Sequence, residues 1–262
     1  MIPPPPRLPH PEDDALTDEE QEALPPGQLV TLTRELLERT LGFPVVHFPG
    51  SYLESFTHKS VSHYYKRQSY ERLEFLGDSV VNFTTAKYLF DRYPDEDEGF
   101  MTKLRTRLTR SETLAFLAER LQLDRFVYMS GKGLYRKWNT NKRILEDCME
   151  SLIGAVYLDQ GLAQAKNFFI GLIERHIDMN DMLKDRNYKD IAMRRQHACG
   201  QPLPAYECET LVQIENERRI KIFRVSVPID EHVGYGAGRT KKEAEQAAAR
   251  DVLVKLGVQL DD

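Results

Sequence analysis

The chain has 262 residues, of which 41% are hydrophobic and 29% charged, a composition typical of a globular protein with one large domain or a large and a small one. Its three cysteines have no paired spacing and no apolar signal segment opens the sequence, so a disulfide-rich secreted protein is not expected. The sequence has no run of about 18 uncharged apolar residues, which a membrane-spanning helix would need. We therefore expect an intracellular protein, cytoplasmic or nuclear, with no membrane partner.

The net charge of −5 is unevenly distributed along the chain. Residues 1–26 carry seven acidic residues and one arginine, a net charge of −6, together with many prolines and few side chains to bury. This composition predicts a disordered or loosely attached arm over residues 1–26. The remainder is close to neutral and its basic residues are clustered, so the acidic total does not exclude an anionic partner.

Residues 27–182 show helical periodicity throughout, in segments such as LVTLTRELLERTLGF and ILEDCMESLIGAVYLDQG. We expect an all-α domain of roughly seven or more helices, one of them over residues 71–90. DRYPDEDEG, residues 91–99, predicts a turn between two helices. GKGLYRKWNTN, residues 131–141, predicts a polar loop.

Residues 187–256 have a different pattern and predict a second, smaller domain. A helix over NYKDIAMRRQHACG is followed by two alternating segments, YECETLVQI and IKIFRVSVPI, which predict strands. A glycine-punctuated stretch, GYGAG, then leads into an alanine-rich closing helix. The order of helix, strands and helix indicates a small α/β domain.

The predicted helix that begins ERLEFLGDSV carries a row of acids. Because each helical residue turns by about 100°, Glu71, Glu74 and Asp78 share one narrow arc. An apolar stripe that faces the core lies opposite them and consists of Leu73, Leu76 and Val80. Phe75 lies beside the acids and away from that stripe, so it needs another surface to cover it, such as a neighbouring helix or a second subunit.

A second predicted helix presents Asp147 and Glu150 as neighbours, three residues apart. If the two acidic faces met, four carboxylates would gather and repel one another unless a hard cation neutralised them. Ligands that are all oxygen favour Mg²⁺ or Mn²⁺ over zinc. From spacing alone, an ordinary solvated acidic face remains an open alternative for each helix.

Four segments in order carry a resemblance to a known family: FTHKS at residues 56–60, ERLEFLGDSV, DEGFMTKLRTRLTRSETLA and RILEDCMESLIGAVYLDQG. Together they resemble the ribonuclease III family. The resemblance implies an all-α endonuclease domain over residues 27–182. It further implies that the following acids bind Mg²⁺, with Mn²⁺ able to substitute: Glu74, Asp78, Asp147 and Glu150. Glu71 and Glu98 match two further catalytic acids, and Phe75 matches an aromatic residue of the dimer interface.

The chemistry that the resemblance implies is hydrolysis of double-stranded RNA by a homodimer without a small-molecule cofactor. The products would carry 5′-phosphates and two-nucleotide 3′ overhangs, with one cut made by each subunit. Further basic residues could meet phosphates or could be ordinary solvated surface: Lys103, Arg105, Arg107, Arg110, Lys132, Arg136, Lys137, Lys142 and Arg143, with Trp138.

Residues 187–256 resemble a double-stranded RNA-binding domain of α-β-β-β-α order, most clearly in GYGAGRTKKEAEQAAARDVL. The RNA-binding residues implied are Arg194, Arg219, Arg239, Lys241 and Lys242. Two of them depart from the usual pattern. Arg194 stands where a Glu is common, directly after Met193, which stands where a Gln or Thr is common. Arg219 is expected in the loop between the first two strands, where a His is common. We therefore expect binding with an altered minor-groove preference.

Two other interpretations stay open from the sequence. One is a catalytically silent binding or structural protein on the same fold, although such proteins typically lose one of the four acids and this chain keeps them all. The other is a protein that only sequesters RNA through its C-terminal domain.

Overall fold

A computed structural model of the chain describes residue 17, residue 19 and the ranges 23–61, 68–184, 186–215 and 218–260. The chain divides into two compact units, residues 1–182 and residues 183–262, hereafter the N-terminal and C-terminal units. Across the described ranges, no helix is long and apolar enough to cross a membrane. Most of the predicted arm lies outside the described residues.

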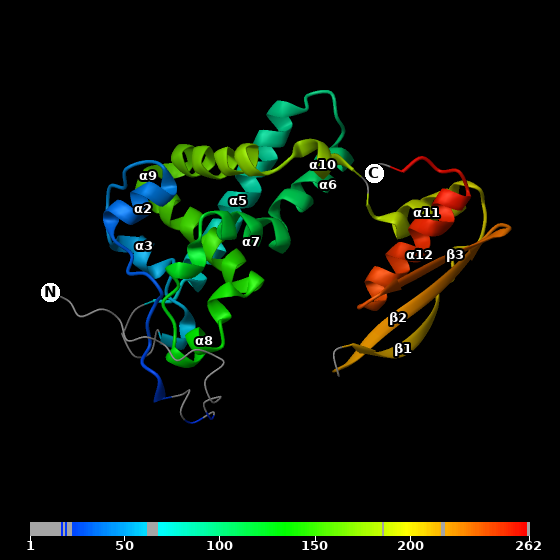
Figure 1. Cartoon of the computed structure of the whole chain (residues 1–262). Helices are drawn as coiled ribbons and strands as arrows, with labels where there is room; N and C mark the ends of the chain where they lie inside the picture. The colour runs from blue at the N-terminus through cyan, green and yellow to red at the C-terminus, as the bar shows by residue number, and fades with distance from the viewer. Residues whose placement is uncertain are drawn as a thin grey trace. The chain divides into compact units, whose positions relative to one another are not determined.

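The N-terminal unit is helical, as the sequence predicts (Figure 1). Its helices in chain order are α2 (Arg34–Leu41), α3 (Gly50–Glu54), α5 (Glu71–Arg92), α6 (Glu98–Thr109), α7 (Ser111–Arg120), η1 (Leu123–Arg125), α8 (Gly131–Tyr135), η2 (Trp138–Thr140) and α9 (Lys142–His176). A short helix, α10 (Met179–Leu183), ends at the first residue of the C-terminal unit. The turn predicted over residues 91–99 is confirmed: α5 ends at Arg92, and Asp97 caps α6 by accepting a hydrogen bond from the Phe100 N–H at 2.8 Å.

Helices α5 and α9 pack together with their backbones in close approach. A Cβ atom placed on Gly77 of α5 would lie 1.8 Å from the carbonyl oxygen of Glu150, and one placed on Gly154 of α9 would lie 2.5 Å from the carbonyl oxygen of Leu73. Only glycine permits such contact, so these two residues bring the two acid-bearing helices together. Helix α9 is buried on nearly all sides before it kinks at Gly161.

Residues 131–141 are not the polar loop that the sequence predicts. They contain α8 and η2, and Gly131, Leu134 and Asn139 are buried. Gly131 is buried because Leu24 packs directly on it: a Cβ atom placed on Gly131 would lie 2.3 Å from the Cβ of Leu24. Asn139 is satisfied inside the protein by donating to the carbonyl oxygen of Asp124 at 3.1 Å. Leu24 therefore packs on the N-terminal unit, although it lies within the segment predicted as an arm.

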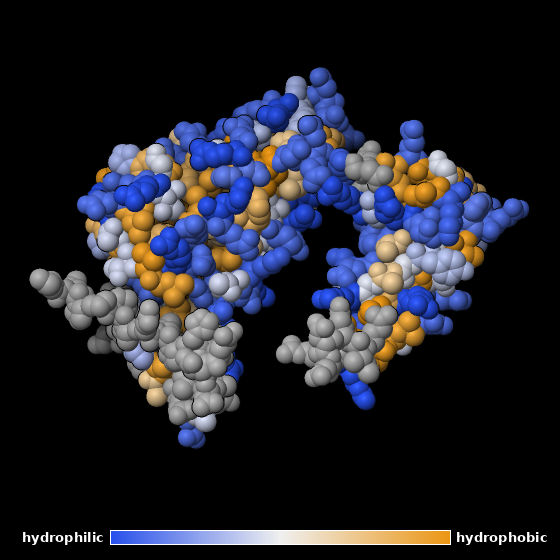
Figure 2. All heavy atoms as spheres, viewed as in Figure 1, coloured by the Kyte–Doolittle hydropathy of each residue, from blue (hydrophilic) through white to orange (hydrophobic). Residues whose placement is uncertain are grey.

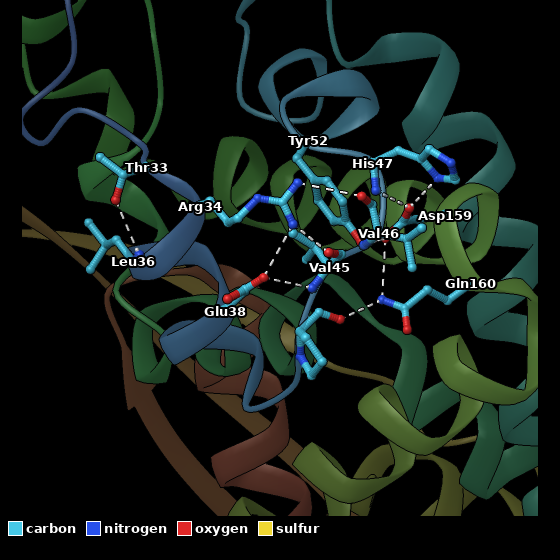
Figure 3. A network of polar contacts seen from close by, with 11 residues as sticks. Thr33, Arg34, Leu36, Glu38, Val45, Val46, His47, Tyr52, Asp159 and Gln160 are labelled. Atoms are coloured by element: carbon cyan, nitrogen blue, oxygen red, sulfur yellow. Dashed lines mark hydrogen bonds and ion pairs between the residues drawn. The ribbon is translucent and has the colours of Figure 1, made fainter.

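Asp159 of α9 ties the segment after α2 to the rest of the N-terminal unit (Figure 3). It accepts hydrogen bonds from the backbone N–H groups of Val46 and His47 at 2.9 and 2.8 Å and from the Tyr52 hydroxyl at 2.9 Å. Burial opposes ionisation of this carboxyl, but these hydrogen bonds outweigh it and lower the pKa of Asp159 to about 2. Asp159 therefore holds this segment as a carboxylate.

The C-terminal unit is a three-stranded antiparallel sheet with helices packed on one face (Figure 1). Its elements are α11 (Tyr188–Ala198), β1 (Glu207–Glu215), β2 (Arg218–Ile229), β3 (His232–Gly238) and α12 (Lys241–Lys255). The GYGAG stretch forms β3, where Gly234 and Gly236 allow α12 to approach: a Cβ on either would lie 2.3 Å from a carbonyl oxygen of α12. Arg219 lies in β2 opposite Ile214, so its predicted place in the connecting loop is wrong.

Each unit has its own hydrophobic core. On the face drawn in Figure 2, hydrophilic residues cover most of the described surface, and hydrophobic residues emerge between them in small groups. Such scattered apolar groups are normal for globular proteins, so the view by itself does not identify a binding surface.

Candidate active site

The four predicted metal-binding acids lie around the contact between α5 and α9. Glu74 and Asp78 are one turn apart on α5, on either side of Gly77, whose backbone touches that of Glu150 on α9. Asp147 is one turn before Glu150 on α9. The close approach of the two glycine-bearing backbones therefore brings two pairs of carboxylates to one place.

The charges of these acids influence one another. Burial, followed by the neighbouring charges of Asp78, Glu146 and Glu74, raises the pKa of Glu150 to about 8. Burial also raises the pKa of Glu74 and of Asp147. For Glu74 the charge of Asp147 adds to this effect, while Arg143 opposes it. The carboxylates thus form a self-repelling group, which a cation would neutralise.

Asp147 is held by a tyrosine that the sequence reasoning missed. The Tyr70 hydroxyl donates a hydrogen bond to Asp147 Oδ2 at 3.2 Å. Burial, followed by the neighbouring Cys148 and Asp147, raises the pKa of Tyr70, so the hydroxyl stays protonated and can donate. Tyr70 directly precedes the motif that carries Glu74, but its own residue type gave no signal of a role.

Glu146 is a fifth acid beside the four, and the sequence reasoning also missed it. It is half-buried on α9 and accepts a hydrogen bond from the Ser111 hydroxyl at the start of α7. Its charge contributes to the raised pKa of Glu74, Asp147 and Glu150. Its spacing was the available signal, because Glu146 is four residues before Glu150 and therefore lies on the same face of the helix.

The other predicted catalytic residues lie at the edges of this site or away from it. Glu71 is exposed and contacts Lys59 Nζ at 3.4 Å and the Ser69 hydroxyl at 3.0 Å. Glu98 opens α6, accepts from the Thr102 hydroxyl at 2.7 Å, and lines a hollow with Phe90 near the end of α5. Phe90 is 12 residues beyond Asp78, or about 18 Å along the helix. The structure therefore does not bring Glu98 to the four acids of its own chain.

Phe75 is 80% exposed, although the same helix buries Leu73 and Val80 in the core. The helical wheel predicted this outcome, because it placed Phe75 beside the acids and away from the core stripe. Phe83 and Phe90 are also exposed along α5. A single chain therefore leaves several aromatic rings of α5 uncovered.

The donor set fits a hard divalent cation in its chemistry, because it consists of carboxylate oxygens on two helices in contact. Within the described ranges, however, no three His, Cys, Asp or Glu side chains are already arranged to enclose an ion. Binding would therefore require some of the four side chains to turn toward a common point. Because the pKa of Glu150 is raised, this side chain holds a proton near neutral pH and must release it when a cation binds.

Three of the five predicted RNA-binding residues cluster at the start of α12. Lys241 and Lys242 are exposed in its first turn, and Arg239 precedes its cap. Thr240 and Glu243 form a capping box that fixes this helix end. Arg194 is exposed on α11 and donates to Asp190 at 2.8 Å. Arg219 is exposed on β2, so the structure places it on the sheet instead of beside the lysines.

Comparisons with known proteins match both units of the chain. The family model described as Ribonuclease-III-like matches residues 52–176, and the one described as Double-stranded RNA binding motif matches residues 195–256. Ribonuclease 3 of Acinetobacter pittii is 39% identical over 206 residues, which cover 76% of this chain and 86% of that protein. A putative protein of Paramecium bursaria Chlorella virus 1 is 38% identical over 230 residues, which cover 87% of this chain and 81% of that protein.

A solved structure of the nuclease domain of ribonuclease III from Campylobacter jejuni superimposes with a TM-score of 0.52 at 33% identity, covering 55% of this chain and 99% of that one. Its title refers to a region involved in dimer formation of that nuclease domain. The family matches cover both units, and the bacterial relative is covered over most of its length. This chain therefore belongs to the ribonuclease III family.

Proposed function

We propose that this protein is a Mg²⁺-dependent endoribonuclease that cleaves double-stranded RNA, leaving 5′-phosphates and two-nucleotide 3′ overhangs. The observation that carries the proposal is the meeting of Glu74 and Asp78 with Asp147 and Glu150 where α5 touches α9. The double-stranded RNA binding motif in the C-terminal unit supplies the substrate class.

In this proposal the four acids hold a divalent cation, which would lower the pKa of a bound water and stabilise charge on the departing 3′ oxygen. The Tyr70 hydroxyl donates to Asp147 Oδ2, so the other oxygen of Asp147 would be available to help hold the cation. Asp78 accepts from the Asn82 amide at 2.8 Å, which fixes one oxygen and leaves the other available. Glu150 gives up the proton that burial favours, so metal affinity should rise with pH up to about 8.

The substrate would be gripped mainly by the C-terminal unit. Lys241 and Lys242 stand at the N-terminus of α12, where both the side-chain charges and the helix dipole favour phosphate. A double-stranded RNA-binding domain uses this end of the helix across the major groove. Arg239 stands beside the two lysines, and Arg194 and Arg219 would contribute from separate elements.

We also propose that the protein acts as a homodimer in which Phe75 contacts the second copy. Phe75 is 80% exposed, and Phe83 and Phe90 are exposed on the same helix, so a second copy that packed on α5 would cover several aromatic rings. Glu98 opens α6 near the far end of α5, away from the four acids of its own chain, so a role in cleavage would require a second copy or the RNA itself. Two sites related by a two-fold axis would cut the two strands of a duplex separately.

The experiment that tests the nuclease proposal compares duplex and single-stranded RNA of the same sequence, each end-labelled. Purified protein is incubated with each RNA in Mg²⁺ and in EDTA, and the ends of the products are mapped. We expect cleavage of the duplex alone, in Mg²⁺ alone, with 5′-phosphate ends and cuts offset by two nucleotides. Equal cleavage of both RNAs, or blunt products, would contradict the proposal.

A catalytically silent RNA-binding protein is the second candidate. It would use the double-stranded RNA binding motif of the C-terminal unit without cleaving the RNA. The two candidates differ in the same experiment, since a silent protein retards the duplex in a gel but leaves it uncut at every metal concentration.

A further inference from the structure

We propose that Tyr70 is a positioning residue for Asp147, and that the FTHKS segment exists in this fold to hold Tyr70 in place. The proposal rests on the proposed function, because it takes Asp147 to be a cation ligand. It assigns a role to a sequence motif, residues 56–60, that contributes no acid to the site.

Tyr70 connects the two acid-bearing helices. It is the residue before α5, and its carbonyl oxygen accepts a hydrogen bond from the Glu74 N–H at 2.8 Å. Its hydroxyl reaches α9 and donates to Asp147 Oδ2 at 3.2 Å. The side chain is 3% exposed, so its orientation is set by protein contacts and not by solvent. One buried residue therefore links the start of the helix that carries Glu74 to a carboxylate of the other helix.

The FTHKS segment supports Tyr70 through its backbone and its ring. The Tyr70 N–H donates to the carbonyl oxygen of Thr57 at 3.0 Å. The His58 ring meets the Tyr70 ring edge to face, with 5.9 Å between centroids. His58 is itself held, because its Nδ1 lies 2.8 Å from the Ser60 hydroxyl, which accepts from the Ser130 N–H at 3.0 Å. The segment thus holds both the backbone and the ring of Tyr70.

The chemistry of a carboxylate explains why this support would matter. A carboxylate has two oxygens with several lone pairs, and a phenol is a donor at neutral pH. A hydrogen bond to Oδ2 restricts rotation of the Asp147 side chain and leaves Oδ1 available to a cation. Partners of this kind orient metal ligands, and their removal typically costs 10- to 100-fold in metal affinity or activity.

The test uses Tyr70→Phe, which removes one hydroxyl and keeps the ring. Binding of Mn²⁺ to the full chain without RNA is measured by electron paramagnetic resonance of the free ion. We expect about 10- to 100-fold weaker Mn²⁺ binding. In cleavage assays, the Mg²⁺ concentration for half-maximal rate should rise by a similar factor, while the KM for RNA at saturating Mg²⁺ stays unchanged.

The chain offers a matched control in Tyr52→Phe. Tyr52 is also buried in the N-terminal unit and also donates its hydroxyl to a carboxylate, Asp159, at 2.9 Å (Figure 3). Asp159 is not one of the four acids, so this variant should bind Mn²⁺ like the unchanged protein. A second test variant, His58→Ala, keeps the Tyr70 hydroxyl but removes its support, and should weaken Mn²⁺ binding by a smaller factor than Tyr70→Phe.

Unchanged Mn²⁺ affinity in both Tyr70→Phe and His58→Ala would overturn the proposal. An equal loss of affinity in Tyr70→Phe and Tyr52→Phe would also overturn it, since the effect would then be a general loss of structure. Cleavage by the unchanged protein is a separate arm of the experiment. If that protein binds Mn²⁺ and cuts duplex RNA, the proposed function stands whatever the tyrosine variants show; if it does neither, the proposed function itself has failed.

Discussion

The raised pKa of Glu150 predicts how the metal-free protein responds to pH. A glutamate ordinarily ionises near pH 4.5, but burial and the neighbouring acids raise the pKa of Glu150 to about 8. Between these values the folded protein keeps a proton that the unfolded chain has released. The free energy of unfolding should therefore fall as pH rises through this window and level off above it. With about 1.4 kcal/mol for each pH unit, the upper limit of this loss is about 5 kcal/mol.

Replacing Glu150 by Gln isolates this effect, because an amide cannot ionise. We expect the metal-free Glu150→Gln variant to be more stable than the unchanged protein near pH 8, by about 2–5 kcal/mol, and to differ little near pH 4.5. Urea unfolding in EDTA can be followed by the fluorescence of Trp138, the single tryptophan, which lies in the N-terminal unit. Glu119→Gln, at an exposed position of α7, is the matched control.

Two results would refute this reasoning. Parallel pH curves for Glu150→Gln and the unchanged protein would mean that Glu150 is not the group responsible. A stability that rises with pH in the unchanged protein and not in the variant would mean that the carboxylate is stabilised in the fold, opposite to what its surroundings imply.

Three further predictions concern other parts of the molecule. Gly77→Ala should lower the free energy of unfolding in urea by about 3 kcal/mol or more, because its methyl group would overlap the backbone of α9. Gly171→Ala, at an open position of α9, should not destabilise the unit, and equal losses in the two variants would contradict the prediction. Asp159→Asn should lower the free energy of unfolding by about 2–4 kcal/mol at pH 7. Because the pKa of Asp159 is lowered to about 2, the unchanged protein should lose this stability as pH falls from about 4 toward 2. A variant as stable as the unchanged protein at pH 7 would contradict this prediction. Lys242→Gln should reduce the slope of log affinity for duplex RNA against log salt concentration by about 1, while Lys255→Gln at the far end of α12 should leave it unchanged. An unchanged slope in both variants would mean that Lys242 does not contact RNA phosphate.

The helical wheel of residues 71–80 predicted much of this site from sequence. The arc of acids, the buried stripe and the exposed Phe75 all follow from a 3.6-residue period, and the structure has them in those positions, although Leu76 is only half-buried. That α5 and α9 meet did not follow from the period. It depends on Gly77 and Gly154, two residues without side chains that carry no weight in a hydrophobic pattern.

Two features that the sequence left wrong or open share a physical cause, which is burial of groups that look polar in sequence. Residues 131–141 read as a loop because of their glycines and polar side chains, yet Gly131 is buried beneath Leu24 and Asn139 is satisfied by Asp124. The acidic face of α9 could equally have been solvated, but Glu150 is only 8% exposed. Such burial depends on contacts between residues far apart in sequence, which a local pattern cannot contain.

The central claim is that the four acids carry metal-dependent cleavage and that the protein does more than bind RNA. The most direct measurement is the single-turnover cleavage rate of one labelled RNA duplex in Mg²⁺, with saturating protein, for the unchanged chain and for Glu150→Gln. Gel retardation of the same samples in EDTA shows how much RNA each protein binds. We predict equal RNA binding by both proteins and cleavage only by the unchanged chain. Equal cleavage rates would contradict the assignment of the four acids, and binding without cleavage by either protein would show that this member of the family only holds RNA.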